Sequence, residues 1–558
     1  MTRALMFVLT VACVSILTTW QAVMAASLSD KLRESLRDRI LSSSGQQKIV
    51  CSLELLCGSA VLPRFYLGRD FLPAWISDDS PKPHANLLVQ AIRQAVHHGL
   101  TPGDYHLGRI EALLDEINHR SRMNSPIEPE ILADLDLLLS DAFLLYASHL
   151  TKGRVNPETI RSEWFIKSRD VDLVELLQRA LDEREIANVI EELPPQHTGY
   201  AALKRALLRY KKLIESGGWP VVPSGPALQK GDRGARVATL RARLTDANHP
   251  SDLNDAGQNL FDEMLEKAVL IFQERHGLKI DGIVGPETLR ALNVPVEDRL
   301  RQIKLNMERW RWLPHYFGKR YILVNIANFE LDIIEHERIL LTMKVVVGRR
   351  YRRTPVFTGR MTYMELNPYW HIPPSIAKKD ILPQIQKDIE YLARKSIRIF
   401  DGWEAEAPEI APETINWSLM TPGNFSYKLV QEPGPTNALG RVKFMFPNKF
   451  SVYLHDTPAR ALFEQNKRSF SSGCIRIERP IELAEYLLKD DPEWTREKII
   501  EAIESRETQI LRIPKPIDVH ILYWTAWVDQ DGTVHFRDDI YGRDKPLDEA
   551  LAEAPPVP

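Results

Sequence analysis

The sequence predicts a multidomain α+β protein: a helical amino-terminal domain, a small three-helix domain, and a mostly β domain with an inserted helical lid. A chain of 558 residues is too long to be built around one hydrophobic core. Apolar residues recur at helical spacing up to about residue 217, whereas runs rich in β-branched residues follow from Arg320 onward. With 44% hydrophobic and 26% charged residues, the composition is that of ordinary globular domains.

The first residues have the layout of an export signal. Arg3 precedes an uncharged apolar stretch from Ala4 to Leu17, and small residues ending in AVMAAS follow it. We therefore expect residues 1–25 to be a signal peptide and the protein to work outside the cytoplasm. The apolar run is at the lower edge of spanning length, so retention as a short membrane anchor is the alternative.

Residues 26–217 are predicted to form the helical domain. The stretches ANLLVQAIRQAVHHGL and EILADLDLLLSDAFLLYASHLTKGR place apolar residues at three- and four-residue intervals and finish near glycine. Cys51 and Cys57 are close enough in sequence to close a small disulfide loop, and two free, buried thiols are the alternative. Residues 218–225, in a stretch rich in proline and glycine, are predicted to be a linker.

Residues 226–294 are predicted to form a three-helix unit. Val237, Leu240 and Leu244 share one helical face, and Gly277 can stop the second helix. Gly285-Pro286 opens the third helix with proline at a position that lacks an intrahelical partner. Such a unit either binds a ligand or serves only as a spacer.

Residues 295–548 are predicted to form the mostly β domain, with residues 549–558 as a tail. RYILVNIANFELDII and ILLTMKVVVG are rich in β-branched residues, and Asp531-Gly532 makes a turn between two later strand-like runs. Residues 371–439 interrupt this pattern, so we expect an inserted lid there, with a surface subdomain as the alternative. Its helical repeat runs through Ile381, Ile385, Ile389 and Leu392.

The stretch SFSSGCIRIERP, residues 469–480, contains a cysteine that faces away from the core of its own strand. Alternation turns Ile475 and Ile477 toward the core and Cys474 away from it. In KFSVYLHD the same alternation predicts a strand from which His455 faces outward. A thiol is mostly protonated at neutral pH, and an imidazole beside it can take the proton. Cys474 and His455 together therefore predict nucleophilic acyl chemistry.

The SSGC turn offers the second requirement of acyl transfer, which is a set of donors for the developing oxyanion. A small, glycine-containing turn lets the N–H groups of Gly473 and Cys474, together with that of Ser472, converge on one point. Arg476, on the same face as Cys474, is a candidate to hold a substrate carboxylate.

These motifs resemble the signature of the L,D-transpeptidases with a YkuD-type catalytic domain. His455 stands in YLHDTP, nineteen positions before Cys474 in SSGCIRIE. That signature usually reads Ser-His-Gly-Cys, and here Ser472 stands where most members have the second histidine. The segments ASHLTKGRVNP, GLTPGDYH, NPYWHIPPSI and YWTAWVDQDGTVHFRDDIYGRD are similar to the large periplasmic, Gram-negative branch, which adds a helical scaffold, a peptidoglycan-binding unit and a lid. Residues 226–294 resemble that peptidoglycan-binding unit.

The resemblance implies a reaction. Cys474 would attack the carbonyl of the diaminoacid at position three of a tetrapeptide stem, expel the terminal D-Ala and leave a thioester. The side-chain amine of another stem would then resolve the thioester into a 3→3 cross-link. His455 would be the general base and later the acid, and Ser472 to Cys474 the oxyanion hole. The residues expected to line the cleft are Tyr453, Arg476, Trp370 and Asn367.

The same resemblance implies a setting. We expect a periplasmic protein, anchored in the inner membrane if the signal is uncleaved, that contributes to cell-wall organisation and cell shape. Its expected partners are peptidoglycan peptide stems, glycan synthases and D,D-carboxypeptidases, and carbapenems should acylate Cys474. No metal or cofactor is expected. A formal net charge of -3, with no Lys/Arg run interleaved with aromatic residues, gives no sign of nucleic-acid binding, and we expect no nucleic-acid partner.

Other functions remain open. Water as acceptor would make the protein an L,D-carboxypeptidase, and an amine on an outer-membrane protein would make it a protein-to-peptidoglycan anchoring enzyme. A non-catalytic wall-binding scaffold would be favoured by loss of Cys474 or His455, and both are present. A papain-like peptidase places its cysteine early and its histidine well downstream, which is the reverse of the order here.

Overall fold

The computed structural model of the protein describes residues 27–42, 49–51, 54–160, 163–167, 169–245 and 259–553. The predicted signal peptide and residues 554–558 of the predicted tail lie outside these ranges. Within the described ranges, no helix combines the length and apolar character needed to cross a membrane. The chain divides into two compact units, residues 1–155 with 169–195 and 553–558, and residues 156–168 with 196–552.

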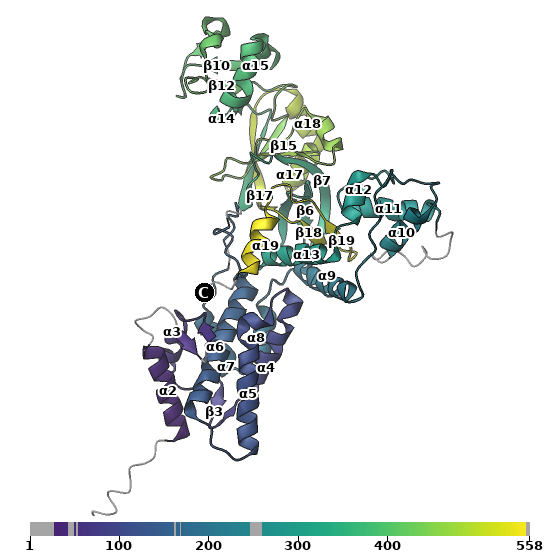
Figure 1. Cartoon of the computed structure of the whole chain (residues 1–558). Coiled ribbons are helices and arrows are strands. Elements are labelled where there is room, and N and C mark those ends of the chain that lie inside the picture. Colours follow the sequence, from purple (N-terminus) through teal and green to yellow (C-terminus); the bar gives the residue numbers. More distant parts are fainter. Residues whose placement is uncertain are drawn as a thin grey trace, which may run out of the picture. The chain divides into compact units, whose positions relative to one another are not determined.

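The first unit is a bundle of helices around the long helix α6 (Pro129–Lys152), drawn in purple and blue in Figure 1. This helix is apolar on most of its circumference, which is why nearly its whole length is buried. Its buried Asp136 accepts hydrogen bonds from the Tyr66 hydroxyl (2.6 Å) and from the amides of Ala74 and Trp75 (3.0 and 2.8 Å). The other helices are α2 (Leu28–Ser42), α3 (Leu62–Gly68), α4 (Pro83–Arg93), α5 (Leu107–Arg122), α7 (Leu173–Asp182) and α8 (Ile186–Glu192).

Short elements connect these helices. The 3-10 turns η1 (Gln94–His98) and η2 (Pro102–Tyr105) lead from α4 into α5. The antiparallel pairs are β1 (Ile49–Cys51) with β2 (Glu54–Leu56), and β3 (Ile76–Ser77) with β4 (Ser80–Pro81). Cys51 and Cys57 are free thiols rather than a disulfide; Cys51 is buried, as the alternative stated, whereas Cys57 is half-buried.

A buried histidine lies beside Cys57 in this unit. His106 places Nε2 at 2.7 Å from Oδ2 of Asp141 and Nδ1 at 3.2 Å from Oε2 of Glu54. Asp141 also accepts the backbone N–H of Cys57 at 3.0 Å. Burial lowers the pKa of His106, but the hydrogen bonds and charges of Asp141 and Glu54 outweigh burial, and the pKa is raised. Burial also raises the pKa of the Cys57 thiol to about 11.

The predicted three-helix unit forms within the second unit. Its helices are α10 (Ala235–Thr245), α11 (Glu263–Arg275) and α12 (Pro286–Leu292). Val237, Leu240 and Leu244 share its core with side chains of α11. Gly277 has φ +62° just after α11, and Pro286 occupies the first turn of α12, as the sequence predicts.

Two further helices pack together in the second unit. Helix α9 (Thr198–Glu215), which the sequence placed with the amino-terminal helices, lies against α13 (Val296–Arg311). A Cβ atom at Gly199 would meet the ring of Trp310 at 2.6 Å. Glycine at this position therefore lets the two helices approach closely.

A closed sheet forms the centre of the second unit. Its order is β15-β7-β16-β14-β13-β8-β17-β5-β6, and β6 also pairs with β7, which closes the strands from β7 to β6 into a ring with β15 attached to β7. The strands are β5 (Arg320–Asn325), β6 (Glu330–Glu335), β7 (Arg338–Gly348), β8 (Phe357–Leu366), β13 (Val442–Met445), β14 (Leu454–His455), β15 (Ser469–Ser471), β16 (Ile475–Ile477) and β17 (Gln509–Leu522). The predicted turn at Asp531-Gly532 lies between β18 (Ala526–Val528) and β19 (Val534–Phe536), which pair antiparallel. Helices α17 (Pro480–Leu488), α18 (Arg496–Glu504) and α19 (Asp544–Ala552) and the turn η7 (Arg460–Glu464) complete the domain.

The strand expected over KFSVYLHD is shorter than the sequence predicts, and this prediction was wrong. Only Leu454–His455 is a strand, because Asn448 holds the preceding residues in a loop. Its Oδ1 accepts the amides of Phe450 and Val452 at 3.0 and 3.2 Å, which takes both donors away from a sheet ladder. Ser451 has φ +53° within the same loop.

The insertion at residues 371–439 is more than helical. The expected repeat begins with η4 (Ala377–Ile381), which runs directly into α15 (Leu382–Lys387). Asp388, whose φ of -161° and ψ of 108° are extended, then separates α15 from α16 (Glu390–Arg394). These elements share a core with a four-stranded sheet that the sequence did not predict, drawn in green in Figure 1. That sheet and the other short elements are β9 (Trp370–His371), α14 (Pro374–Ile376), β10 (Ile397–Phe400), β11 (Glu409–Ile410), η5 (Pro412–Thr414), η6 (Trp417–Leu419) and β12 (Lys428–Gln431).

Candidate active site

The turn that carries Cys474 joins β15 to β16 and is held by its own hydroxyl groups. Ser471 Oγ donates to the carbonyl of Cys474 (2.5 Å) and accepts the amide of Gly473 (3.1 Å). The Thr354 hydroxyl donates to the carbonyl of Gly473 at 2.8 Å. Gly473 has φ +120°, a conformation that side chains with a Cβ rarely adopt. The turn therefore needs glycine at this position, but the Gly473 amide is already occupied by Ser471.

The register of the sheet sets the neighbours of Cys474. Lys443 pairs with His455, and His455 pairs with Arg476 on the parallel strand β16. We call residues that pair across the strands a row, so Lys443, His455 and Arg476 form one row. Because alternate residues of a strand share a face, Tyr453 and Cys474 lie on the same face of the sheet, two residues before His455 and Arg476. The amide of Ile475 donates to the carbonyl of Tyr453 at 3.1 Å, which fixes that register. The cysteine and the histidine thus lie on adjacent strands, diagonal to each other.

His455 is buried, with 4% of its surface exposed, so the expectation that it faces outward was wrong. Its Nδ1 donates to the carbonyl of Asp456 at 2.5 Å. A carbonyl can only accept, so Nδ1 carries the proton and the neutral ring has its lone pair on Nε2. Burial and the nearby Arg476 lower the pKa of His455 to about 3, against the carbonyls of Asp456 and Leu439. The ring is therefore a neutral base at physiological pH.

Cys474 is half-buried, and its Sγ lies 3.6 Å from the carbonyl of Ser451. Burial raises its pKa, while hydrogen bonds with Tyr453 and the charges of Lys443 and Arg476 act in the opposite direction. In the part of the chain that the structure describes, no hydrogen bond joins Sγ to His455. The pair is therefore a thiol beside a neutral imidazole, rather than a preformed thiolate and imidazolium.

Two of the predicted cleft residues lie beside the cysteine. Burial and the neighbouring Cys474 raise the pKa of Tyr453 well above its ordinary value, and a hydrogen bond with Trp370 acts against this shift. The rings of Tyr453 and His455 meet edge to face, with centroids 5.6 Å apart. Trp370 begins β9, which pairs with β12 of the insertion, so the sheet of the insertion reaches a residue that bonds Tyr453 beside the cysteine.

The structure does not bring Asn367 into this group. Its side-chain amide donates to the carbonyls of Ala502 and Glu507 at 3.0 and 3.1 Å. Its own carbonyl accepts the Thr508 hydroxyl at 2.6 Å. Asn367 therefore ties the end of β8 to the segment around α18, and both N–H donors of its side-chain amide are used within the domain.

Comparison with known families agrees with this geometry. Residues 319–498 match the family of L,D-transpeptidase catalytic domains called YkuD. These residues form an L,D-transpeptidase catalytic domain. Residues 60–207 match a "Scaffold domain", and residues 233–292 match a "Putative peptidoglycan binding domain". The three domains that the resemblance implied are present, in the expected order.

Two curated proteins match parts of the chain. A protein of Haemophilus influenzae named "Putative L,D-transpeptidase" is 32% identical over 253 residues, which cover 45% of this chain and 50% of that protein. The N-acetylmuramoyl-L-alanine amidase CwlM of Mycobacterium tuberculosis is 45% identical over 75 residues, which cover 12% of this chain and 18% of that protein. The chain thus spans half or less of the length of these relatives.

One solved structure that matches part of the chain is that of the L,D-transpeptidase (residues 123–326) of Xylanimonas cellulosilytica. It is 16% identical, with a TM-score of 0.17, and the match covers 54% of this chain and 99% of that one.

Arginines lie around the turn that carries Cys474. Arg476 Nε is buried and has no hydrogen-bond partner among the described residues. Burial and the nearby Arg349 lower the pKa of the Arg476 guanidinium. Arg352 donates to the Ser472 hydroxyl at 2.8 Å and also pairs with Asp380 of the insertion. The turn therefore lies in a cationic environment that suits a carboxylate-bearing substrate.

Three residues near the site were missed by reasoning from the sequence. Lys443 lies 3.2 Å from a carboxylate oxygen of Glu365 and 4.8 Å from the centroid of the Tyr453 ring. Both residues belong to the row of His455, because Lys443 also pairs with Glu365 on β8. Arg352 is the third. Only the strand register and the course of the loop after β7 place these residues, and neither is visible in a single sequence. Among the residues that the structure places, no cluster of three or more His, Cys, Asp or Glu side chains suits a metal ion.

Proposed function

We propose that the protein is a peptidoglycan L,D-transpeptidase that forms 3→3 cross-links through a thioester on Cys474. The observation that carries the proposal is the pairing of β14 with β16, which puts Cys474 beside a neutral histidine. The Asp456 carbonyl holds the proton of His455 on Nδ1, and this leaves Nε2 as the base. The family to which residues 319–498 belong supports the reaction class.

The first step forms the thioester. His455 Nε2 takes the thiol proton as Sγ of Cys474 bonds to the carbonyl carbon of the third stem residue. The tetrahedral oxyanion is stabilised by backbone N–H groups of the turn, for which Ser472 and Cys474 remain candidates because Ser471 occupies the Gly473 amide. The bond to D-Ala then breaks, and the imidazolium gives its proton to the amine of the leaving D-Ala. The thioester remains on the enzyme.

The second step consumes the thioester. The side-chain amine of an acceptor stem attacks the thioester carbonyl, and His455 takes the proton that this amine loses. The C–S bond breaks, and the proton returns to the sulfur as the cross-link forms. The charge of Arg476, which has no carboxylate partner in the described chain, suits a carboxylate of the donor stem. Trp370 and the insertion that follows it reduce access of water, which would otherwise hydrolyse the thioester.

The scaffold and peptidoglycan-binding domains support a place in the cell wall. We infer that the protein is exported by residues 1–25 to the periplasm and acts there on peptide stems. Glycan synthases and D,D-carboxypeptidases are the enzymes that would supply its substrates, because they make the strands and trim the stems to tetrapeptides.

The experiment is mass spectrometry of a disaccharide-tetrapeptide incubated with the protein and with Cys474→Ala. The expected product is a dimer that lacks one D-Ala and is absent with the variant. Cys57→Ala is the matched control and should behave as the parent protein. Tripeptide without dimer would replace the proposal with an L,D-carboxypeptidase. No change with any of the proteins would favour a non-catalytic scaffold, and dimer formation by Cys474→Ala would contradict the nucleophile.

A further inference from the structure

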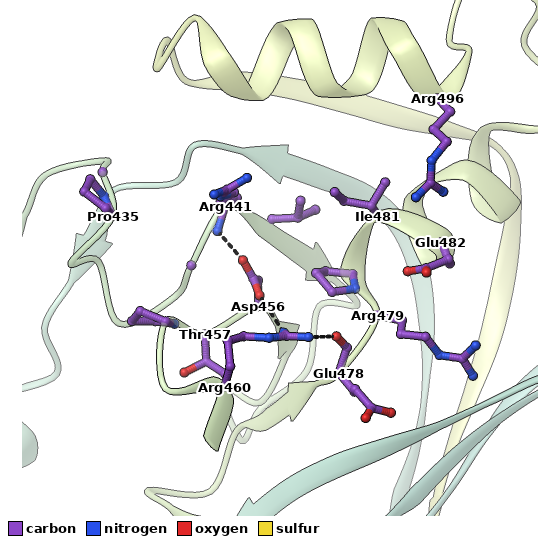
Figure 2. Close-up of a pocket in the computed structure, with 15 residues that line it drawn as sticks. Pro435, Arg441, Asp456, Thr457, Arg460, Glu478, Arg479, Ile481, Glu482 and Arg496 are labelled. Carbon is purple, nitrogen blue, oxygen red and sulfur yellow. Dashed lines mark hydrogen bonds and ion pairs between the residues drawn. The ribbon is translucent and has the colours of Figure 1, made fainter. Parts of the chain in front are cut away.

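A cavity lies on the catalytic domain, beyond His455. It has a volume of about 570 Å³ and is lined by residues that follow β14 and β16, by the start of β13 and by the first turn of α17. Figure 2 shows Arg441, Arg460, Arg479 and Arg496 around it, with Asp456 near its centre. Cavities of this size hold ligands the size of short peptides.

The cavity is joined to the catalytic face by the strand pattern. Thr457 and Glu478 line it, and each lies two residues beyond a member of the His455–Arg476 row. Successive alternate residues are about 7 Å apart along a strand, so His455 lies between Cys474 and this cavity. Asp456 belongs to both places, because its carbonyl binds His455 and its side chain lines the cavity.

The cavity carries more positive charge than its own carboxylates neutralise. Arg460 bonds Asp456 (3.4 Å) and the Glu478 carbonyl, as Figure 2 shows, and the Glu478 carboxylate accepts the amide of Lys344. Arg496 pairs with Glu485 at 2.8 Å. For the side chains of Arg441 and Arg479, the described chain offers no hydrogen-bond or ion-pair partner. Glu482 also lines the cavity, so its four arginines face three carboxylates and leave one net positive charge, with the guanidinium groups of Arg441 and Arg479 open to a ligand.

We propose that this cavity binds the free carboxylates of the acceptor stem peptide, with Arg441 and Arg479 as the anchoring residues. Guanidinium groups bind carboxylates through paired, charge-assisted hydrogen bonds. The acceptor amine must reach His455, which takes its proton, and the cavity begins one row beyond that histidine. The donor carbonyl must instead reach Cys474, on the other side of His455. The inference rests on the proposed function and adds the place of the second substrate.

The first test measures binding without turnover. The tripeptide L-Ala-γ-D-Glu-diaminopimelate, with free carboxylates, is titrated into Cys474→Ala and into Cys474→Ala with Arg441→Gln and Arg479→Gln. The two arginine changes should weaken binding by about tenfold or more, which is the usual loss when a charge-assisted hydrogen bond is removed. The amidated tripeptide should bind equally weakly to both proteins. Equal affinity of the two proteins for the free tripeptide would overturn the inference.

A matched control separates this cavity from general charge effects. Arg338→Gln changes an exposed arginine at the hairpin of β6 and β7, at the opposite end of β7 from the residues that pair with β16. This variant should bind the free tripeptide like the parent. If Arg338→Gln weakens binding as much as the double variant, the attraction is non-specific and the inference fails. Inorganic phosphate, at the same ionic strength as the chloride buffer, tests whether the cavity distinguishes carboxylates from other anions. Full competition by phosphate would overturn the inference and make the cavity a general anion site.

The second test follows transfer. With Arg441→Gln and Arg479→Gln in the active protein, the thioester should form within about twofold of the parent rate while transfer to the acceptor falls about tenfold. Equal loss of thioester formation and transfer would contradict an acceptor role. If the parent protein forms neither thioester nor dimer, the proposed function fails, and the tripeptide titration still decides whether the cavity binds carboxylates.

Discussion

Each compact unit of the protein places a cysteine beside a histidine, and only one of the two pairs is arranged for chemistry. In the first unit both nitrogens of His106 face carboxylates, Asp141 and Glu54, and its pKa is raised. In the second unit Nδ1 of His455 donates to a backbone carbonyl, and its pKa is lowered to about 3. His106 thus favours its charged form, which has no lone pair to accept a proton, whereas His455 stays neutral and keeps one.

The comparison also separates the two thiols. Burial raises the pKa of both Cys57 and Cys474, so the pKa alone does not distinguish a reactive cysteine. The difference lies in the neighbours. Cys474 shares its face of the sheet with Tyr453, His455 and Arg476, while the carboxylates of Asp141, Asp104 and Glu54 act on Cys57 and oppose a thiolate. A buried thiol becomes a nucleophile when its neighbours accept its proton and tolerate its charge.

The largest expected effect is on covalent labelling. A carbapenem should add its mass to the protein at Cys474, and Cys474→Ala should abolish the adduct because Cys474 is the thiol that lies beside a neutral imidazole. Cys57→Ala should leave the adduct unchanged, since His106 has no lone pair to offer. Intact-protein mass spectrometry with peptide mapping measures this. An adduct that survives in Cys474→Ala would place the reactive thiol elsewhere and break the comparison.

The two histidines should separate activity from stability. His455→Gln should lower the rate of thioester formation by about 10²–10⁴, the usual contribution of a general base. His106→Gln should leave this rate within about twofold and lower the melting temperature, because it leaves the buried Asp141 without its charged partner. Stopped-flow acylation and thermal unfolding measure the two effects. The comparison is contradicted if His106→Gln slows acylation as much as His455→Gln.

Two glycines offer a smaller contrast. Gly473→Ala forces a side chain into φ +120° at the nucleophile turn, so acylation should slow by about tenfold or more as the oxyanion donors shift. Gly58→Ala puts a Cβ 2.7 Å from the Asp141 carboxylate and should reduce stability without changing the acylation rate. Acylation kinetics and melting temperatures of both variants test this. An unchanged acylation rate in Gly473→Ala would show that the turn tolerates a side chain.

The smallest expected effect is that the contributions of His106 and His455 to folding stability change with pH in opposite directions. The raised pKa of His106 means that its contribution to stability is fully present below about pH 6.5 and is lost as pH rises through its folded pKa. The lowered pKa of His455 has the opposite sign, because the unfolded state binds more protons and stability falls as pH drops from about 6.5 toward 3. The melting temperatures of His106→Gln and His455→Gln, each compared with the parent from pH 4 to 8, should diverge in opposite directions. Parallel pH profiles would contradict this.

Much of the fold was predictable, because long helices and strands repeat their apolar residues over many positions. Helices α10, α11 and α12 and the β18–β19 hairpin follow the predicted pattern. The sheet of the insertion could not be predicted from the sequence, because β9 and β11 have two residues each and so show no alternation. The strand before His455 was overestimated because a single side chain, Asn448, takes the donors that alternation assigned to a ladder.

The residues of the candidate site also divide into those that the sequence could predict and those that it could not. Cys474 and His455 could be named from the sequence because each stands in a short motif with its own chemistry. Lys443 and Glu365 could not, since they join the site only through cross-strand pairing between segments far apart in the chain. Asn367 shows the reverse case: it stands in a suggestive motif, yet its amide is bound to the carbonyls of Ala502 and Glu507.

The contact with Arg352 suggests a role for the serine at position 472, where most members of the family have a histidine. One guanidinium touches both the Ser472 hydroxyl and the Asp380 carboxylate of the insertion. A neutral hydroxyl can accept from an arginine at a place where a protonated imidazole would repel it. The serine in this turn thus connects the insertion, through Arg352, to the turn that carries Cys474. A movement of the insertion that releases Arg352 would remove a contact two residues from the sulfur.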